Sequence, residues 1–209
     1  MSSSAKSEFF SLVRDEFAPA LRDLGFKGSG QNFRRIRGEV INAVNIQGNK
    51  YGGSVAVNLG LHLTFLPVSW SADFPKVSTI KEVDCEFRQR LAPRGRLDYW
   101  WKYDGMFSSP RKSVDHLVAT YLNRGEPRFL EFDSTEKIAG MLKPEDIVCD
   151  KTYMRFGYVN AVHGALVMAK INRHLGNTTL AVEFAKAGLN NIGKATIFKP
   201  HLEEFLDAS

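Results

Sequence analysis

The residues of this chain that could do chemistry are polar side chains in its first half. Side-chain amides donate and accept hydrogen bonds, an arginine binds anions, and an imidazole can take up a proton near neutral pH. The candidate ligand-binding residues are Arg34, Asn45, Gln47, Asn58, His62, Arg88 and Trp100. Residues of these types suit a surface that binds a small polar ligand or a protein partner. The sequence predicts no catalytic residue, no metal site and no cofactor.

Residues 31–65 predict three antiparallel strands that position most of these side chains. In the third strand, aliphatic residues share one face while Asn58 and His62 share the other. Gly38-Glu39 suits a two-residue hairpin turn, and residues 48–53 suit a longer one. The predicted core face collects Phe33, Val44, Ile46, Val55, Val57, Leu59, Leu61 and Leu63, and the opposite face collects Arg34, Ile36, Ile41, Ala43, Asn45, Gln47, Asn58 and His62.

The second turn also predicts a register. It places Val44 opposite Val57, so that Arg34 and Asn58 would flank Ala43 from either side. Two interpretations of the amide-rich face stay open. It is either a half-solvated sheet face, which is normal for antiparallel sheets, or a surface that binds a polar ligand. If helices covered both faces, these polar groups would have to bond internally.

A second hairpin is expected farther along the chain. Residues 84–91 and 97–103 both alternate, with the sequence APRGR between them as a turn. This hairpin would extend the sheet to about five strands. A helix over residues 82–91 is the alternative, because the charges of this segment also fit a helical surface.

Trp100 and Trp101 are adjacent, so on a strand their side chains point to opposite faces. One would enter the core, and the other would lie on the side of Arg88 and Arg90. An arginine beside an exposed aromatic ring could stack a base or bind a cation. Ordinary cross-strand packing is the other interpretation.

Helices are predicted before and after this sheet segment in the sequence. The expected helices cover residues 4–24, 110–122 and 134–142, and residues 153–207 are expected to form a helical bundle. The first helix should kink near Pro19, and the second should end at residues 123–125. Residues 129–132 are expected to be extended. The predicted fold class is α+β, with an antiparallel sheet of about five strands packed by an N-terminal helix and further helices, and with a C-terminal helical bundle. We expect one α+β domain over residues 1–150, and a helical hairpin with one further helix over residues 151–209.

Composition narrows the class of protein. The chain has 209 residues, 44% of them apolar, which suffices for one compact core. No apolar run reaches the roughly 18 residues of a membrane span, and the N-terminus does not resemble a secretory signal. Cys85 and Cys149 have no partner spacing for zinc and suit a reducing cytoplasm. The net charge of +5 is spread over separate clusters, which favours a solvated surface over a nucleic-acid interface.

Part of the chain resembles a bacterial family. The resemblance rests on the runs LRDLGFKGSGQNFRRIRGEVINAVNIQGNK, VNLGLH, CEFRQRL and DYWWKYD. Its signature elements are Leu24-Gly25-Phe26, Phe33, Asn45 to Gln47, Asn58-Leu59-Gly60, Cys85, Arg90-Leu91 and Trp100-Trp101. Over roughly residues 8–140, the chain is similar to the domain of unknown function family 4304. This resemblance implies an α+β fold, and it implies no reaction, ligand or catalytic residue.

Three functions compete at this point. The leading hypothesis is a non-enzymatic binding or interaction module that uses the amide-rich sheet face. A second is a small hydrolase or transferase in which His62 is the base, with Arg34 and Asn58 nearby and Glu86 or Asp98 as the acid partner. A third is a weak nucleic-acid binder that uses the arginine clusters and Trp100 or Trp101. The sequence indicates no particular oligomeric state.

Overall fold

A computed structural model of the chain describes residues 2–68, 73–147, 151–154 and 156–207. The chain divides into two compact units, Met1–Glu131 and Phe132–Ser209. The boundary between these compact units falls earlier in the chain than the predicted domain boundary after residue 150. Compact units are not domains, so the predicted division into domains stays a prediction.

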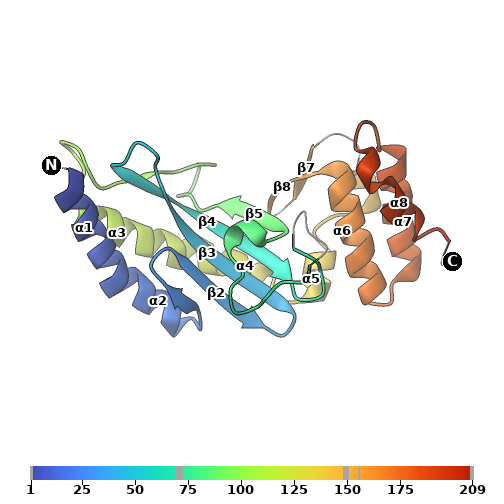
Figure 1. The fold of residues 1–209 in the computed structure, drawn as a ribbon, viewed down its shortest axis with the longest axis horizontal. Helices are drawn as coiled ribbons and strands as arrows, with labels where there is room; N and C mark the ends of the chain where they lie inside the picture. Colours follow the sequence, from blue (N-terminus) through green and yellow to red (C-terminus); the bar gives the residue numbers. More distant parts are fainter. Residues whose placement is uncertain (1, 69–72, 148–150, 155, 208–209) are drawn as a thin grey trace. The chain divides into compact units, whose positions relative to one another are not determined.

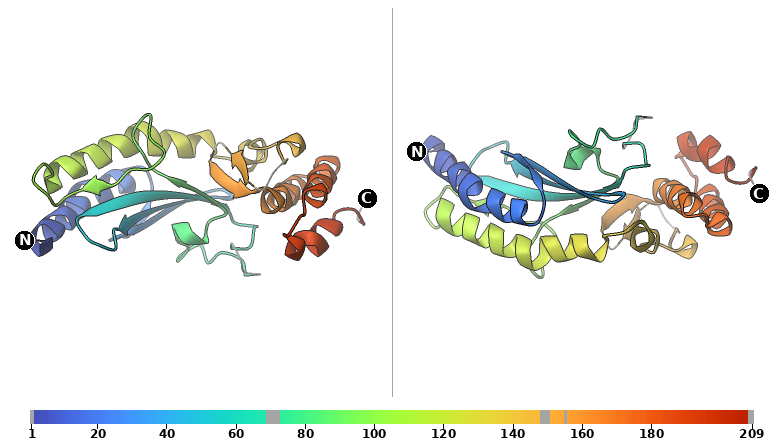
Figure 2. Two further views of the ribbon diagram at one scale, coloured as in Figure 1. Left: turned by 90° about the horizontal axis from the view of Figure 1, so that it is seen from above. Right: turned by 90° about the horizontal axis from the view of Figure 1, so that it is seen from below.

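The first unit is an antiparallel sheet with its long helices on one face (Figure 1). Its helical elements are α1 (Ser2–Leu12), η1 (Val13–Phe17), α2 (Ala18–Asp23), η2 (Glu82–Asp84), α3 (Pro110–Thr120), η3 (Tyr121–Gly125) and α4 (Glu126–Glu131). Its strands are β1 (Lys27–Ser29), β2 (Asn32–Arg37), β3 (Val40–Gly48), β4 (Ser54–Leu63), β5 (Phe87–Arg90) and β6 (Trp101–Lys102). Figure 2 shows α1, α2 and α3 on one side of the sheet and the short η2 on the other. The α+β prediction is confirmed.

The strands follow the order β1-β2-β3-β4-β5, and every neighbouring pair is antiparallel. The turn at Gly38 sets the register between β2 and β3, with Arg37 opposite Val40. Gly38 has a φ of 57°, which a residue without a side chain adopts at little cost. The predicted first turn is therefore confirmed.

The register across the second turn differs from the predicted one. Val44 lies opposite Leu59, whereas the sequence predicted Val57 there. Pairing continues farther into the turn than expected, because the N–H of Asn49 donates to the carbonyl of Ser54 at 3.0 Å. The resulting shift is two residues. Because side chains alternate with a period of two, this shift changes every cross-strand partner and leaves each side chain on its predicted face.

The predicted second hairpin is wrong. β5 and β6 both run antiparallel to β4, along the same edge, so they do not pair with each other. Leu91 still donates its N–H to the carbonyl of Val57 before the chain leaves the sheet, and the chain returns at Trp101 opposite Val55. β5 and β6 therefore form one interrupted edge strand, and the APRGR sequence lies in the loop that connects them. The helix considered for residues 82–91 is limited to the single turn η2.

The core lies between the sheet and the long helices. Phe17 packs edge to face on Phe33 with ring centroids 6.5 Å apart, and on Tyr121 at 5.5 Å. The predicted core face is confirmed, because its residues are nearly inaccessible: Phe33, Val44, Ile46, Val55, Val57, Leu59, Leu61 and Leu63. Trp101, opposite Val55, is the core tryptophan of the adjacent pair.

Two helical runs continue through π-helical turns near prolines. The N-terminal run is helical from α1 through η1 to α2, and η1 ends two residues before Pro19. The run that begins with α3 continues through η3, which ends two residues before Pro127. A proline lacks the N–H that an α-helical bond needs, and a π-helical turn is one way to adjust the backbone there. The predicted start at Ser109 is confirmed, since its Oγ accepts the N–H of Lys112 at 3.2 Å.

Two expectations for this second run are wrong. The helical conformation does not end at residues 123–125, and residues 129–131 are helical in α4 and not extended. The buried side of α4 explains why the helix continues. Phe129 is completely buried and packs against Phe26 with ring centroids 6.0 Å apart, so the extra helical turn brings an aromatic side chain into the core.

The second unit contains helices and one small hairpin. Its elements are α5 (Thr135–Ala139), η4 (Pro144–Asp146), β7 (Lys151–Met154), β8 (Gly157–Asn160), α6 (Ala161–His174), α7 (Thr178–Asn190), η5 (Thr196–Phe198) and α8 (Lys199–Glu203). The hairpin of β7 and β8 corrects the prediction that residues 153–207 are helical from their beginning. The expected helix after Ser134 is confirmed, and Ser134 Oγ accepts the N–H of Lys137 at 3.3 Å. Cys149 lies outside the described residues.

Candidate binding face

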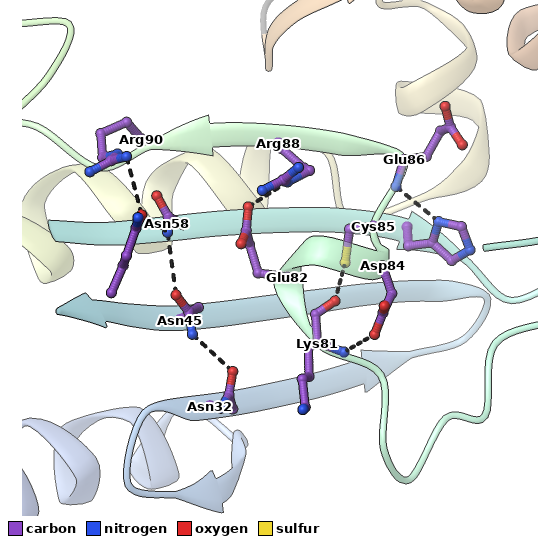
Figure 3. Close-up of polar contacts among 12 residues, drawn as sticks. Asn32, Asn45, Asn58, Lys81, Glu82, Asp84, Cys85, Glu86, Arg88 and Arg90 are labelled. Atoms are coloured by element: carbon purple, nitrogen blue, oxygen red, sulfur yellow. Dashed lines mark hydrogen bonds and ion pairs between the residues drawn. The ribbon is translucent and has the colours of Figure 1, made fainter. Parts of the chain in front are cut away.

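A row of side-chain amides crosses three neighbouring strands on the side of the sheet opposite the long helices (Figure 3). We call Asn32, Asn45, Gln47 and Asn58 the amide row. Asn45 Nδ2 donates to Asn32 Oδ1 at 2.9 Å. Asn58 Nδ2 donates both to Asn45 Oδ1 at 3.3 Å and to Gln47 Oε1 at 3.1 Å. These bonds fix the orientation of four polar side chains on a half-open surface.

The row ends at an arginine on the edge strand. Arg90 Nη2 donates to Gln47 Oε1 at 3.3 Å, and the guanidinium carbon of Arg90 lies 5.2 Å from the centre of the Trp100 ring. Arg90 also pairs with Asp98, whose Oδ1 lies 3.6 Å from Arg90 Nη1. Trp100 therefore lies on the polar side, beside Arg90, as the alternation predicted. We call the amide row together with Arg34, Arg88, Arg90 and Trp100 the polar face.

The turn η2 covers the middle of this side of the sheet. Cys85 and Ile80 are buried against Ile41 and Ala43. Gly60 makes this approach possible, because a Cβ at this position would stand 2.7 Å from Cys85 Sγ. Burial raises the pKa of the Cys85 thiol well above its usual value, so this thiol is a packing group. Beside η2, the polar face keeps exposed or half-exposed side chains, among them Asn45, Gln47 and Arg90.

Glu82 and Arg88 form an ion pair at the border of the covered region. Arg88 Nε donates to Glu82 Oε1 at 2.6 Å, and the Glu82 side chain is 2% exposed. Glu82 Oε2 is buried and has no hydrogen-bond partner among the described residues. Figure 3 shows this carboxylate directed toward Arg88. The guanidinium of Arg88 itself reaches solvent, since its side chain is 51% exposed.

His62 is a structural residue in this geometry. The ring is fully buried, its Nδ1 accepts the N–H of Glu86 at 3.1 Å, and its Nε2 lies 3.2 Å from the carbonyl oxygen of Leu66. Because Nδ1 accepts a hydrogen bond, Nε2 carries the proton and donates to Leu66. Both ring nitrogens are thus occupied by backbone groups, and His62 has no nitrogen with which to act as a base. The geometry gives no support to the His62 enzyme hypothesis.

Burial lowers the pKa of His62 to about 4. An unfolded histidine titrates near 6.5, so between these values the unfolded chain binds more protons than the folded chain. Stability from this group is complete above about pH 6.5 and decreases as the pH falls toward 4. We expect the free energy of unfolding of the wild type to fall by about 2 kcal/mol from pH 7 to pH 5 on account of His62.

The measurement is urea unfolding at both pH values for the wild type and His62→Gln. The variant should be less stable at pH 7 and should lose the part of the pH dependence that His62 contributes. Some dependence should remain, because burial and Lys170 also lower the pKa of His163 to about 4. His116→Gln, at an exposed position on α3, is the control. An unchanged pH dependence in His62→Gln would mean that His62 is not held neutral.

Arg34 lies on the polar side but apart from the amide row. It is opposite Ala43, and on the other side of Ala43 stands Gly60. The expectation that Arg34 and Asn58 flank Ala43 is therefore wrong, because the two-residue shift places Asn58 opposite Asn45. Among the described residues, no hydrogen bond joins Arg34 to the row. Arg34 contributes a half-exposed cation to the same surface.

Three residues of the polar side were missing from the sequence-based candidates. Asn32 lies opposite Asn45, a pairing that the first turn alone defines. Arg90 shares its face with Arg88, and alternation along the strand was a sufficient signal for it. Glu82 had no local signal, because the chain between β4 and β5 has no regular pattern that would bring η2 onto the sheet.

Three cavities are described in this unit, and none of the three is lined by Asn45, Gln47, Asn58 or His62. Within the described ranges, no group of three His, Cys, Asp or Glu side chains is arranged to hold a metal ion. The helices of the described part are also too short or too polar to cross a lipid bilayer.

The fold and the polar face define an α+β domain, built on an antiparallel sheet that carries helices on one side and an ordered polar surface on the other. The family model described as "Domain of unknown function (DUF4304)" matches residues 17–127, more than half of the chain. The chain belongs to this family, which confirms the resemblance over a somewhat shorter range than residues 8–140. No curated protein and no solved structure matches the chain significantly.

Proposed function

We propose that this protein is a non-enzymatic interaction module whose polar face binds an acidic segment of a partner protein. The observation that carries the proposal is the kind of hydrogen-bonding group left open on this surface. Gln47 Oε1 already accepts two bonds, whereas the Gln47 amide nitrogen has no partner among the described residues and the side chain is exposed. The surface therefore offers donors, which an acceptor-rich partner would satisfy.

The charges of the polar face support an acidic partner. Arg34, Arg88 and Arg90 all belong to it. Arg88 pairs with Glu82 at 2.6 Å and Arg90 lies 3.6 Å from Asp98, so two of the acids near this surface are engaged by arginines. Arg88 has further guanidinium donors in solvent. Complementary charge increases association rates and selects among partners, while oriented amides recognise the carbonyl groups of an extended peptide.

Preorganisation is a second support. The amide row is held by hydrogen bonds between neighbouring strands, so its side chains need little further ordering when a partner binds. Trp100 lies at the end of the row and is half-buried. A ring at the edge of a polar surface supplies contact area with few rotatable bonds, and tryptophan and arginine are enriched at binding hot spots.

The alternative of nucleic-acid binding has less support. In the sequence, Arg34, Arg35 and Arg37 form a cluster, but Arg35 is buried in an ion pair on the core side. The strand alternates, so Arg34 and Arg37 also face opposite sides of the sheet. Trp101 is buried, which leaves only Trp100 of this pair to stack a base. A continuous basic stripe, which phosphate backbones require, is therefore not assembled from this cluster.

We also propose a cytoplasmic location. Cys85 is a buried, reduced thiol, which suits a reducing compartment.

The proposal predicts charge-dependent and amide-dependent binding of an acidic peptide. The probe is a fluorescein-labelled peptide that alternates Glu and Ser, and the measurement is fluorescence anisotropy at low and physiological salt. We expect saturable binding by the wild type. Arg34→Ala/Arg90→Ala should weaken it about tenfold, and Gln47→Leu should weaken it severalfold although the charge is unchanged.

Controls separate this binding from general attraction to a basic protein. Lys6→Ala, on the exposed surface of α1, removes one positive charge and should leave the affinity within twofold. A labelled single-stranded oligonucleotide of similar charge is the second probe, and it should bind more weakly than the peptide. The proposal fails if the peptide does not bind, if Gln47→Leu binds like the wild type, or if the oligonucleotide binds more tightly.

A further inference from the structure

A separate cavity of about 570 Å³ lies where β6 meets the beginning of α3. Its walls come from the segment before β6, from β6 itself, from the segment before α3 and from the first two turns of α3. This volume is within the range of about 300–1,000 Å³ that is usual for small-molecule sites. The polar face and this cavity share Trp100, but the amide row does not line the cavity.

Hydrogen bonds and ring contacts hold the walls of the cavity in place. Ser113 Oγ donates to the carbonyl oxygen of Lys102 at 2.5 Å, which ties α3 to β6. Tyr99 packs edge to face on Trp101 with centroids 4.9 Å apart, and on the His116 ring at 5.4 Å. The part of the wall formed by these groups is therefore already ordered and loses little further freedom when a ligand enters.

The cavity is positively charged. Arg96, Lys102 and Lys112 line it, and none of the three has an acidic side chain within ion-pair distance among the described residues. Asp98 is the one acidic residue of the lining, and it is paired with Arg90 at 3.6 Å. Unpaired cations that line a concave surface raise the local concentration of anions, so this cavity favours an anionic ligand.

The cavity is also aromatic. Tyr99, Trp100 and Phe107 line it, and Phe107 is 95% exposed. Met106, the preceding residue in the chain, is 92% exposed. A large exposed ring in the lining of a pocket offers apolar area that a ligand with an apolar face would cover. The rings favour a planar group that they can stack.

We propose that this cavity binds a small anion that carries a planar ring, such as a mononucleotide. Arg96, Lys102 and Lys112 bind the anionic group, the hydroxyls of the serines beside α3 add neutral hydrogen bonds, and the ring lies against Trp100 and Phe107. This site does not depend on the proposed interaction with an acidic peptide, because the donors of the amide row are outside it.

The experiment is isothermal titration of the full chain with AMP, adenosine and inorganic phosphate. We expect saturable binding of AMP, and at least tenfold weaker binding of adenosine and of phosphate, because each lacks one of the two recognised groups. Lys102→Ala/Lys112→Ala should weaken AMP binding about tenfold or more, since charge-assisted hydrogen bonds are lost. Both side chains are exposed, so an unchanged melting temperature should show that the variant is folded.

Two variants act as controls. Lys6→Ala should bind AMP like the wild type, and so should Gln47→Leu, because Gln47 lies outside the cavity lining. Absence of AMP binding at millimolar concentration overturns the inference, as does wild-type affinity in the double lysine variant. Equal affinity for AMP and adenosine would exclude the anion, equal affinity for AMP and phosphate would exclude the ring, and weakened binding in Gln47→Leu would place the ligand elsewhere.

Discussion

Replacing Glu126 with alanine is expected to lower the free energy of unfolding by about 3–5 kcal/mol, the range for breaking a buried ion pair from one side. Glu126 Oε1 accepts Arg35 Nη1 at 2.7 Å, and the side chains of Arg35 and Glu126 are 3% and 9% exposed. Without Glu126, the guanidinium of Arg35 stays buried with no compensating charge. Urea unfolding at pH 7 measures the loss.

The surroundings of Arg35 explain why it cannot move away. Its guanidinium also donates to Asn42 Oδ1 at 2.9 and 3.1 Å and to the carbonyl oxygen of Leu24 at 2.9 Å. Its guanidinium carbon lies 4.4 Å from the centre of the Phe26 ring. These partners hold the cation on the core side of β2, where water cannot replace the lost carboxylate.

Glu126 has a second role through Tyr121. The Tyr121 hydroxyl donates to Glu126 Oε2 at 3.2 Å, and burial together with the charge of Glu126 raises the pKa of Tyr121 far above its usual value. Tyr121 therefore stays a neutral donor. A Cβ at Gly125 would stand 2.6 Å from the Tyr121 ring, so the glycine allows the ring to lie against the helix backbone.

Two further variants test the charge argument for Glu126. Asp115→Ala breaks an exposed pair on α3, in which Arg111 Nη1 lies 3.7 Å from Asp115, and it should cost no more than about 0.5 kcal/mol. Arg35→Met/Glu126→Leu removes both charges and should be less destabilised than Glu126→Ala, although Asn42 and Leu24 lose a donor. A double variant as unstable as Glu126→Ala would show that the unpaired charge is not the cause.

Gly60→Ala is expected to cost about 3 kcal/mol, at the upper end for overpacking a core. A Cβ at residue 60 would stand 2.7 Å from Cys85 Sγ and 3.1 Å from Glu82 Cα. The contact with Glu82 is to backbone, so a side-chain rotation cannot relieve it, and η2 has to move off the sheet. Thermal and urea unfolding of the variant measure the cost.

A matched glycine and a double variant sharpen this prediction. Gly48→Ala places a methyl group where no atom lies within 4 Å, and it should change stability by less than about 0.5 kcal/mol. Cys85→Ala should partly rescue Gly60→Ala, because it removes the closest atom, and the coupling should be about 1 kcal/mol. Strict additivity of the two substitutions would contradict direct packing of Cys85 on Gly60.

Local patterns were sufficient for the three central strands and for the assignment of their faces. Alternation in residues 31–65 separates Val57 from Asn58, and the Gly38-Glu39 turn defines the pairs between β2 and β3. These signals depend only on neighbours in the chain. The faces were assigned correctly although the register across the second turn was wrong, because the register error was an even number of residues.

The rest of the candidate site, and the ion pair on the core side, depend on contacts that no local pattern encodes. Alternation places Arg35 on the core side with Phe33, but its partner Glu126 is 91 residues away in the chain. Cys85 reaches Gly60 only because the chain between β4 and β5 folds back across the sheet. His62 appeared to be a free base, since the backbone groups of Leu66 and Glu86 that occupy its nitrogens cannot be recognised from residue types.

The central claim, that the polar face is a binding surface, is tested most directly by side-chain amide signals in ¹⁵N-¹H correlation spectra during titration with the acidic peptide. The amide groups of Asn32, Asn45, Gln47 and Asn58 report the surface itself. The account predicts saturable shifts of these signals together with the Trp100 indole signal, and small shifts elsewhere. Binding of the peptide with these signals unmoved, or with the largest shifts on α1 and α3, would contradict it.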